Sequence, residues 1–237
     1  MMPPEISRSE TAVNDDSLRD MSEYVKRRYR SPQRAAAAAA TRARIREAAA
    51  ELFVERGFVA TTMRDVAKRA RVGERTLYDA FPSKTALFGH TLGVATVGDE
   101  QPVPVADRPE VRAARDEGDP AAAIAQYVEY LAALLDRAGD LIMVSVEAAG
   151  SDPDMRAAAD AGATETHRLW LAFTEQLHAR GALREGLTAV DAADILYALG
   201  SPHLHQLLRR HRGWSSRRYR TWLEGVLGAE LLGRAAP

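Results

Sequence analysis

Residues 61–84 read TTMRDVAKRARVGERTLYDAFPSK, and this stretch decides the fold prediction for the whole chain. It predicts two short helices joined by a tight turn. Thr62 can N-cap the first helix, because its hydroxyl accepts from an unpaired backbone N–H and Asp65 completes a capping box. Gly73 breaks the pattern with a residue that tolerates backbone angles closed to other residues. Two helices about such a turn are typical of a helix-turn-helix motif, whose second helix enters the DNA major groove.

Helical periodicity continues on both sides of this motif. Upstream, an amphipathic stripe is formed by Ile45, Ala48, Ala49, Leu52 and Phe53. Gly57 is placed to end that helix. A connecting helix is expected after Pro82, with Ser83 as its N-cap. Residues 34–97 are therefore predicted to form a three-helix DNA-binding domain with its connecting helix.

The same region resembles a known protein family. The matching positions are Gly57-Phe58, Thr61-Thr62, Asp65-Val66-Ala67, Val72-Gly73, Thr76-Leu77-Tyr78 and Phe81-Pro82-Ser83-Lys84. They resemble the N-terminal DNA-binding domain of the TetR family of transcriptional repressors. Two positions depart from the family's pattern: Glu74 stands where Lys is frequent, and Asp79-Ala80 replaces an aromatic or basic pair. The resemblance implies a homodimer and a C-terminal domain that holds a small-molecule inducer.

Seven residues form the predicted DNA-binding set. They are Thr61, Thr62, Gly73, Arg75, Thr76, Tyr78 and Lys84. Arg75 can make two hydrogen bonds to guanine, and Thr76 can touch a thymine methyl group or a phosphate. Thr62, Tyr78 and Lys84 suit phosphates, which position a protein without reading sequence. The resemblance gives the matching Tyr and Lys the same role, although Tyr78 has the alternative of packing against the preceding helix.

Charge divides the 237-residue chain into two parts. Residues 24–84 hold fifteen Lys or Arg and six Asp or Glu, a formal charge of +9, so the remainder carries −10. A basic segment on an acidic remainder favours a polyanion-binding region attached to a body with another task. The chain has no Cys, which excludes disulfides and thiolate sites. No apolar run reaches membrane-spanning length, and we expect a cytoplasmic protein without membrane contact.

Composition sets the remaining domain boundaries. Residues 1–33 are predicted to be a disordered tail, with a basic arm at residues 26–30 that either lies along DNA or stays solvated. Residues 98–120 carry several Pro and acidic residues and are expected to be a linker. Residues 121–237 show helical periods without alternation of period two. We therefore predict an all-α chain whose second domain is a helical bundle for effector binding and dimerisation.

Five helices are expected in this second domain. They cover residues 121–137, 141–149, 154–180, 191–212 and 215–232. The second is almost wholly apolar and should be buried, so Glu147 within it must be paired, exposed or protonated. Gly181 should end the third helix. The Ser201-Pro202 pair after Gly200 indicates a kink in the fourth.

Seven polar or aromatic residues predict the effector pocket. They are Tyr127, Tyr130, Met143, Glu147, His167, Trp170 and Thr174. An apolar pocket with a few polar groups is typical of a small-molecule site, and we expect a small, largely apolar effector. The alternative is that these aromatic side chains form ordinary core.

No residue pattern favours catalysis, a cofactor or a metal. His203 and His205 point to different sides of a helix, without a carboxylate at helical spacing. A nucleophile elbow and a Gly-rich phosphate loop are both missing from the sequence. An enzyme with a vestigial DNA-binding region would need such a constellation. We therefore predict neither an enzyme nor a bound cofactor.

Two copies are expected to pair through the last two helices, as the resemblance also implies. Their apolar stripes are Ala192, Ile195, Leu196, Leu199 and His203; Trp222, Val226, Ala229 and Leu232; and Leu223, Leu227 and Glu230. This surface exceeds what one partner helix covers, which predicts a four-helix interface. The interpretation is a homodimeric repressor of a palindromic double-stranded operator, released by its effector. An architectural DNA-binding protein without an effector is the alternative, and it predicts a filled core.

Overall fold

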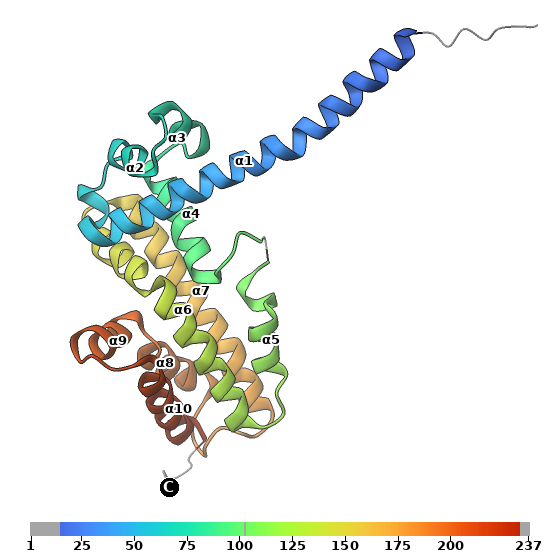
Figure 1. The fold of residues 1–237 in the computed structure, drawn as a ribbon. Coiled ribbons are helices and arrows are strands. Elements are labelled where there is room, and N and C mark those ends of the chain that lie inside the picture. The colour runs from blue at the N-terminus through green and yellow to red at the C-terminus, as the bar shows by residue number, and fades with distance from the viewer. Residues whose placement is uncertain (1–14, 102, 233–237) are drawn as a thin grey trace, which may run out of the picture. The chain divides into compact units, whose positions relative to one another are not determined.

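The computed structural model describes residues 15–101 and 103–232, with side chains from residue 33 onward. All regular elements in these ranges are helical, which confirms the all-α prediction (Figure 1). The first four are α1 Asp15–Ala60, α2 Met63–Ala70, α3 Glu74–Ala80 and α4 Lys84–Val97. They are followed by the 3₁₀ turn η1 Val105–Asp107, α5 Pro109–Asp116, α6 Pro120–Ala148, α7 Pro153–Ala179, α8 Ala189–Leu199, α9 Pro202–Gln206, the π-helical turn η2 Leu207–His211 and α10 Ser216–Leu232.

The chain divides into two compact units, residues 1–44 and residues 45–237. In the first, the backbone is helical from Asp15, inside the segment predicted to be disordered. The alanine run at residues 35–40 has high helix propensity and favours this extension. The predicted disorder of residues 1–14 and the side chains of the basic arm lie outside the described parts. Within the second unit, we call residues 45–97 the head and residues 98–232 the body.

The helix-turn-helix ends are fixed by short polar side chains. The Thr62 hydroxyl accepts from the Asp65 backbone N–H at 3.1 Å and donates to its carboxylate at 2.7 Å. The Ser83 hydroxyl accepts from the Ala86 N–H at 3.0 Å and starts α4. Both N-caps are as predicted, because each hydroxyl satisfies a donor that the first helical turn leaves unpaired.

The turn between α2 and α3 differs from its prediction. Arg71, not Gly73, takes the left-handed conformation, with φ 55° and ψ 48°. Its backbone N–H reaches the Lys68 carbonyl at 3.3 Å, which closes the last turn of α2. Gly73 is extended at φ −68° and N-caps α3 without a side chain. The presence of Gly73 therefore did not locate the left-handed residue, because the positive φ is needed at Arg71, where α2 ends.

The head core is built around three phenylalanines. Phe53, Phe58 and Phe88 are buried, with ring centroids 5.0–5.9 Å apart. Leu77 of α3 and Phe81 are buried in the same cluster, as predicted. The end of α6 and the start of α7 join this core through Leu141, Val144, Ala148 and Met155. The apolar segment predicted to be buried therefore packs against the head.

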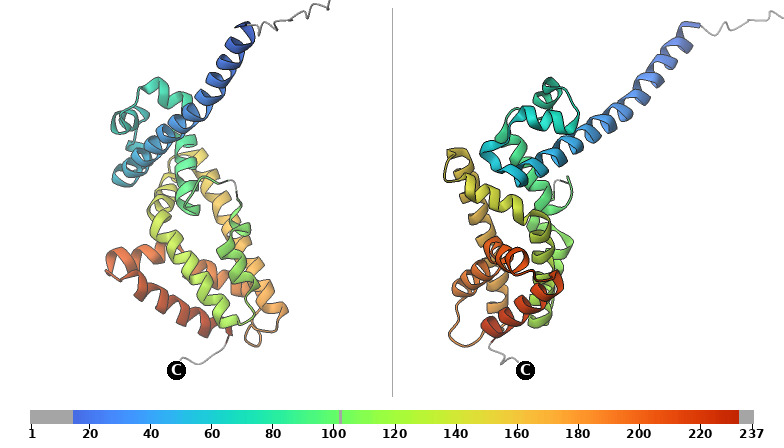
Figure 2. Two further views of the ribbon diagram at one scale, coloured as in Figure 1. Left: turned by 45° about the vertical axis from the view of Figure 1, so that its right-hand side comes forward. Right: turned by 60° about the vertical axis from the view of Figure 1, so that its left-hand side comes forward.

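In the body, α6 and α7 lie side by side and α8 and α10 pack on them (Figures 1 and 2). The two helices predicted at residues 121–137 and 141–149 are one continuous helix, α6, because nothing between them breaks the helical pattern. α7 stops at Ala179, and Gly181 follows at φ 66°, as expected. Leu223 and Leu227 are 0% and 2% exposed in the body core. One of the stripes predicted to meet a second copy is therefore used within the chain.

The kink predicted near Ser201 is a complete break between α8 and α9. Pro202 opens α9, and the Ser201 hydroxyl accepts from the Leu204 N–H at 3.3 Å. Gly200 before them is buried where the chain passes close to other helices. A Cβ there would lie 2.8 Å from Leu131 Cδ2 and 3.2 Å from Trp170 Cζ2. Only glycine fits this crossing.

Replacing Gly200 by alanine should lower the free energy of unfolding by about 1–3 kcal/mol, because the added methyl group overpacks the core. Gly162 is the matched control, since it lies inside α7 with nothing within 4 Å of its Cβ position. Gly162→Ala should stabilise by about 0.5–1 kcal/mol through helix propensity. Urea unfolding of both variants tests the pair. Equal and small effects would show that the crossing has room for a methyl group.

Candidate functional site

The second helix of the motif presents a polar face. Arg75 and Thr76 of α3 are exposed, and Tyr78 is 49% exposed, whereas Leu77 between them is fully buried. Glu74 at the start of α3 lies 3.7 Å from Arg64 of α2, and both side chains are exposed. The exposed face of α3 thus carries a guanidinium, a hydroxyl and a phenol, groups that read base edges and bind phosphates.

The other residues of the predicted DNA-binding set are placed less uniformly. Thr61 is 0% exposed, and its hydroxyl donates to the carbonyls of Gly57 at 2.8 Å and Leu52 at 3.1 Å. Its predicted DNA contact is wrong, because the hydroxyl joins α1 to α2 inside the core. Thr62 is exposed, with its hydroxyl engaged by Asp65, and Gly73 is exposed at the start of α3.

Lys84 has an intramolecular role that its spacing did not reveal. Its ammonium donates to the carbonyls of Phe58 at 2.8 Å and Val59 at 3.4 Å. It also lies 4.3 Å from the centroid of the Phe58 ring. Burial lowers the pKa of this ammonium, and the charge of Asp152 acts in the opposite direction. Lys84 therefore ties α4 to the end of α1, and its predicted phosphate contact would require part of this arrangement to change.

Several basic side chains of the head are used internally. Arg69 of α2 binds two carboxylates of α1, Glu51 at 2.8 Å and Glu55 at 3.0 Å. Among the described residues, no ion pair engages Arg71 or Arg75, and both are exposed. Arg71 was not in the predicted DNA-binding set. The sequence signal that could have indicated it is a basic residue in the turn, at the end of α2. Arg71 adds a positive charge beside α3.

Arg71→Gly should separate stability from DNA affinity. Removing the strain of a left-handed non-glycine residue should stabilise the folded state by about 1–2 kcal/mol. The greater freedom of glycine in the unfolded chain opposes this by about 0.4–1 kcal/mol. A small net stabilisation is therefore expected, measured by thermal unfolding. Affinity for random DNA should fall, and the slope of log affinity against log salt should drop by about one. An unchanged salt slope would exclude Arg71 from the phosphate contacts.

Three members of the predicted effector set are ordinary core. The Tyr127 ring is 4.7 Å from Trp170 and 4.5 Å from Phe173, and all three side chains are buried. Burial raises the pKa of Tyr127. Thr174 is 0% exposed and donates to the Ala189 carbonyl at 2.7 Å, at the start of α8. These residues fill the space that was predicted to hold a ligand.

Three other members do not line the cavity described below. Glu147 is exposed on α6, which settles how an acidic residue is accommodated in that apolar segment. Met143 is half-buried on the same helix. His167 of α7 contacts the Asp194 carboxylate at 2.9 Å and lies near Tyr197 of α8, so it belongs to the α7–α8 surface. Of the predicted set, Tyr130 lines the cavity between α4, α5 and α6.

This cavity, of about 590 Å³, lies between the end of α4, α5 and the middle of α6. Its walls include residues 97–99, Arg108 and Ala113, and from α6 Tyr130, Ala133 and Arg137. Arg108 comes from the segment expected to be a loop or short-helix linker, which forms η1 and the short helix α5. The sequence reasoning therefore searched for the pocket in the core of the bundle, whereas the cavity uses the linker as one wall.

Two arginines of the cavity wall hold the end of α4. Arg108 is 8% exposed and donates to both oxygens of Asp99, at 2.6 and 3.0 Å. Hydrogen bonding from Arg108 lowers the pKa of Asp99 to about 2. Arg137 donates to the carbonyls of Ala95 at 3.4 Å and Thr96 at 3.1 Å, which the last turn of α4 leaves unpaired. Glu100, which follows Asp99 in the chain, binds Arg46 of α1. Asp99 thus binds the body, and Glu100 binds the head.

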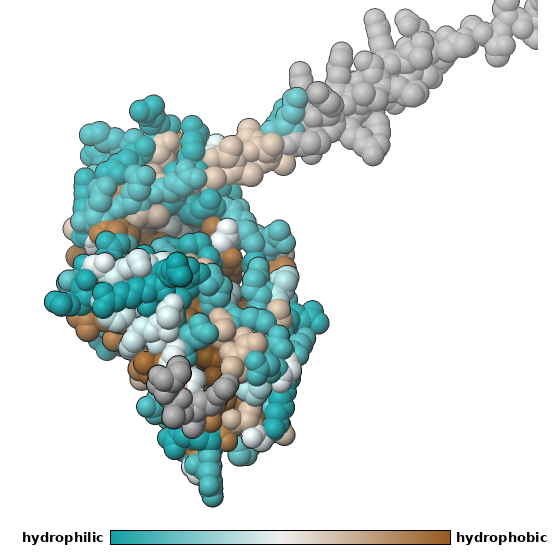
Figure 3. All heavy atoms as spheres, turned by 60° about the horizontal axis from the view of Figure 1, so that its bottom comes forward, coloured by the Kyte–Doolittle hydropathy of each residue, from teal (hydrophilic) through white to brown (hydrophobic). Residues whose placement is uncertain are grey.

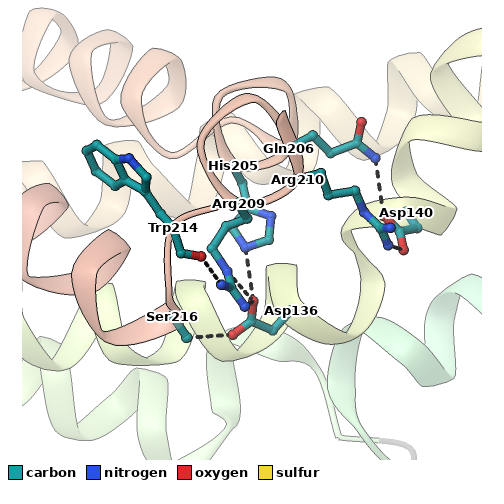
Figure 4. Close-up of polar contacts among 8 residues, drawn as sticks. All are labelled: Asp136, Asp140, His205, Gln206, Arg209, Arg210, Trp214 and Ser216. Atoms are coloured by element: carbon teal, nitrogen blue, oxygen red, sulfur yellow. Dashed lines mark hydrogen bonds and ion pairs between the residues drawn. The ribbon is translucent and has the colours of Figure 1, made fainter. Parts of the chain in front are cut away.

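Two further carboxylates of α6 hold the chain between α9 and α10 (Figure 4). Asp136 accepts from His205 at 3.2 Å, from Arg209 at 3.1 Å and from Ser216 at 2.7 Å. Asp140 accepts from Gln206 at 3.2 Å and pairs with Arg210. His205 is 6% exposed beside the Tyr219 ring, at a centroid distance of 4.9 Å. The contacts fix the π-helical turn η2 on α6.

This junction should make stability fall in mild acid. Burial lowers the pKa of His205 from 6.5, against the Asp136 contact, so below about pH 6.5 the unfolded state takes up a proton that the folded state resists. Burial would raise the pKa of Asp136, but its hydrogen bonds outweigh this and lower it, so its contribution is also lost as pH falls. His205→Gln should reduce the loss of unfolding free energy between pH 7.5 and 5.5. His178 is exposed, so His178→Gln should leave the loss of unfolding free energy unchanged. Identical pH profiles for the wild type and both variants would show that His205 is not the origin of the loss.

Among the described residues, no group of three His, Asp or Glu side chains is arranged to hold a metal ion. No helix among them is long and apolar enough to cross a membrane.

An all-α fold with an exposed second helix in a helix-turn-helix defines a DNA-binding protein. Residues 45–91 match the sequence model of the family described as bacterial regulatory proteins, tetR family. Residues 45–91 therefore form the DNA-binding region that this family model describes. No curated protein matches its sequence.

Solved structures share the fold over most of their length. NalD of Pseudomonas aeruginosa, the secondary repressor of the MexAB-OprM multidrug efflux pump, is 20% identical, with 81% of this chain and 95% of that chain covered and a TM-score of 0.62. A putative transcriptional regulator from Saccharomonospora viridis in complex with choline is 19% identical over 83% and 100% of the chains, with a TM-score of 0.64. AibR in complex with isovaleryl coenzyme A and operator DNA is 18% identical over 78% and 97%, with a TM-score of 0.60.

Proposed function

We propose that this protein is a homodimeric repressor that leaves a palindromic operator when a small molecule enters the cavity beneath α4. The observation that carries the proposal is the placement of α4. Its first residue, Lys84, is bound to the end of α1 in the head, and its last turn is held by Arg137 in the cavity wall. A ligand that changes this wall acts on the helix that leads to the head.

The similar structures support a head that binds DNA and a body that binds a small molecule. One of them is a repressor, one holds choline, and one holds an acyl coenzyme A together with operator DNA. The architectural alternative predicts a filled core, and the pocket predicted among Tyr127, Trp170 and Thr174 is filled. The case for an effector rests on the separate cavity between α4, α5 and α6. By linkage, an effector releases DNA only to the extent that it binds the released conformation more tightly.

The dimer surface is proposed on α8 and α10. Val190 and Tyr197 of α8 are 53% and 40% exposed, and Trp222 and Val226 of α10 are half-buried. Seen from the end of the body at which these helices lie, apolar residues are interspersed with hydrophilic ones on the surface (Figure 3). Scattered exposed apolar residues are normal on a protein surface, so the proposal rests on their position on two helices that pack against each other, α8 and α10. Pairing α8 and α10 with their copies would cover them and set the spacing of the two α3 helices.

The test is a footprint on the DNA that flanks the protein's own gene, followed by titration with small molecules. The proposal expects a protected palindrome and release of the protein by at least one compound that also binds it in calorimetry. Binding to all DNA with equal affinity would support the architectural alternative and refute the repressor.

A further inference from the structure

The cavity wall contains hydrogen-bond donors that the protein itself leaves unmatched. The Nε of Arg108 and the hydroxyl of Tyr130 are both buried, and neither has a hydrogen-bond partner among the described residues. A buried donor without a partner is costly and is often explained by a ligand or a function. Tyr130, Arg108 and Arg137 line the same cavity, together with the carboxylates of Asp99, Glu110 and Glu129, of which Glu129 pairs with Arg220 of α10.

Asp99 already shows which chemistry Arg108 binds. Its carboxylate meets two N–H groups of the guanidinium side by side, at 2.6 and 3.0 Å. This paired geometry suits a carboxylate or a phosphate. One of the two nitrogens also donates to the Gln101 carbonyl at 3.3 Å, and an acid that took the place of Asp99 would in addition find the Nε, the Tyr130 hydroxyl and the positive charge of Arg137 beside it. The Asp99 carboxylate is 38% exposed and can leave toward solvent.

We propose that the effector is a small organic acid whose carboxylate displaces Asp99 and binds at Arg108 and Tyr130, beside Arg137. The apolar part of the acid would lie against Val97 and Ala133 in the same cavity. This assignment rests on the proposed function and names the ligand class for its site. This ligand class differs from the largely apolar effector expected from the sequence, because charged and polar side chains line the cavity instead of an aromatic core.

Displacement of Asp99 also explains how the acid would act on DNA binding. Gly98 ends α4 at φ 90°, and the Arg137 guanidinium lies 3.5 Å from its Cβ position. Asp99 and Glu100 follow directly, and Glu100 is bound to Arg46 of the head. An acid that takes Arg108 from Asp99 therefore releases one of the contacts that fix the segment between α4 and α5.

The experiment compares hexanoate with hexanamide, hexanol and hexylamine, which differ only at the polar end. Calorimetry with the full chain should show hexanoate binding at least about tenfold more tightly than each of the others. Asp99→Asn removes the internal competitor and should strengthen hexanoate binding, whereas Arg108→Gln should abolish it. Equal binding of hexanamide or hexylamine, or no binding of hexanoate even to Asp99→Asn, would overturn the assignment.

Tyr130→Phe gives a second readout that does not depend on the fold being damaged. Its hydroxyl has no partner, so its removal should leave thermal stability unchanged or raised while hexanoate binding weakens about fivefold. Tyr219→Phe is the matched control, because that hydroxyl is also buried without a partner but lies beside His205. It should not alter hexanoate binding. Equal hexanoate affinity for both variants would remove Tyr130 from the site.

Operator binding is measured in the same samples. If a compound other than an acid releases the operator, the repressor stands and the acid assignment fails. If the protein binds no operator even without a compound, the proposed repressor function is refuted, and the acid assignment that rests on it falls with it. Release by hexanoate that is lost in Arg108→Gln would support both.

Discussion

Arg75→Ala should relax the base preference of the operator at one position in each half-site by about 1–3 kcal/mol, since a bidentate contact to guanine is lost. Arg75 is exposed on α3, the helix that enters the major groove in proteins with this motif. The effect occurs in both heads of a dimer, so the total loss of operator affinity should be large. Binding to a set of operators substituted at every position measures it.

Two control variants separate base reading from general binding. Tyr78→Phe removes a hydroxyl suited to a phosphate and should weaken operator and random DNA by the same factor. Arg168→Ala removes a body arginine that pairs with Glu165 and should change neither. If Arg75→Ala weakens every sequence equally, Arg75 binds phosphate and another residue of α3 reads the bases.

Val226→Glu should convert the dimer to monomers and lower operator affinity by about 10²–10⁴-fold, because two linked heads bind far more tightly than one. Val226 is half-buried on α10 and lies on the proposed dimer surface. A carboxylate there would be buried without a partner in the four-helix contact, which opposes association. Sedimentation and operator binding measure the two effects.

Val146→Glu is the matched control for this charge. Val146 is 39% exposed on α6, away from α8 and α10. That variant should remain dimeric with full operator affinity. Leu223→Glu would be a poor test, since Leu223 is fully buried within one chain and its loss would unfold the body. A dimeric Val226→Glu protein with unchanged affinity would move the interface to another surface.

The sequence predicted what depends on local chemistry. The N-caps at Thr62 and Ser83 and the buried positions of Leu77 and Phe81 follow from side-chain type and spacing alone, and Ser201-Pro202 indicated a kink where the helix in fact breaks. These signals act over one or two helical turns, so no knowledge of distant partners was needed. The DNA-binding residues could be proposed for the same reason.

The effector site could not be found in this way, because it depends on packing between distant segments. Periodicity makes Trp170 and Thr174 equally suitable for a pocket or for core, and only the neighbouring rings decide. Arg108 lies beside a proline in a segment without a helical period, so nothing local indicated that it would be buried against Asp99. Thr61 matched a family position, yet its hydroxyl faces inward.

The length of α4 gives a sense of scale for release from DNA. Its fourteen residues span about 21 Å at 1.5 Å per residue. Tilting such a rod by about 10° about one end moves the other end by about 3.6 Å, close to the 3.4 Å step between successive base pairs. A rearrangement of the side chains around Gly98 thus has enough leverage to put one reading head out of step with its half-site, while the bundle beneath it keeps its packing.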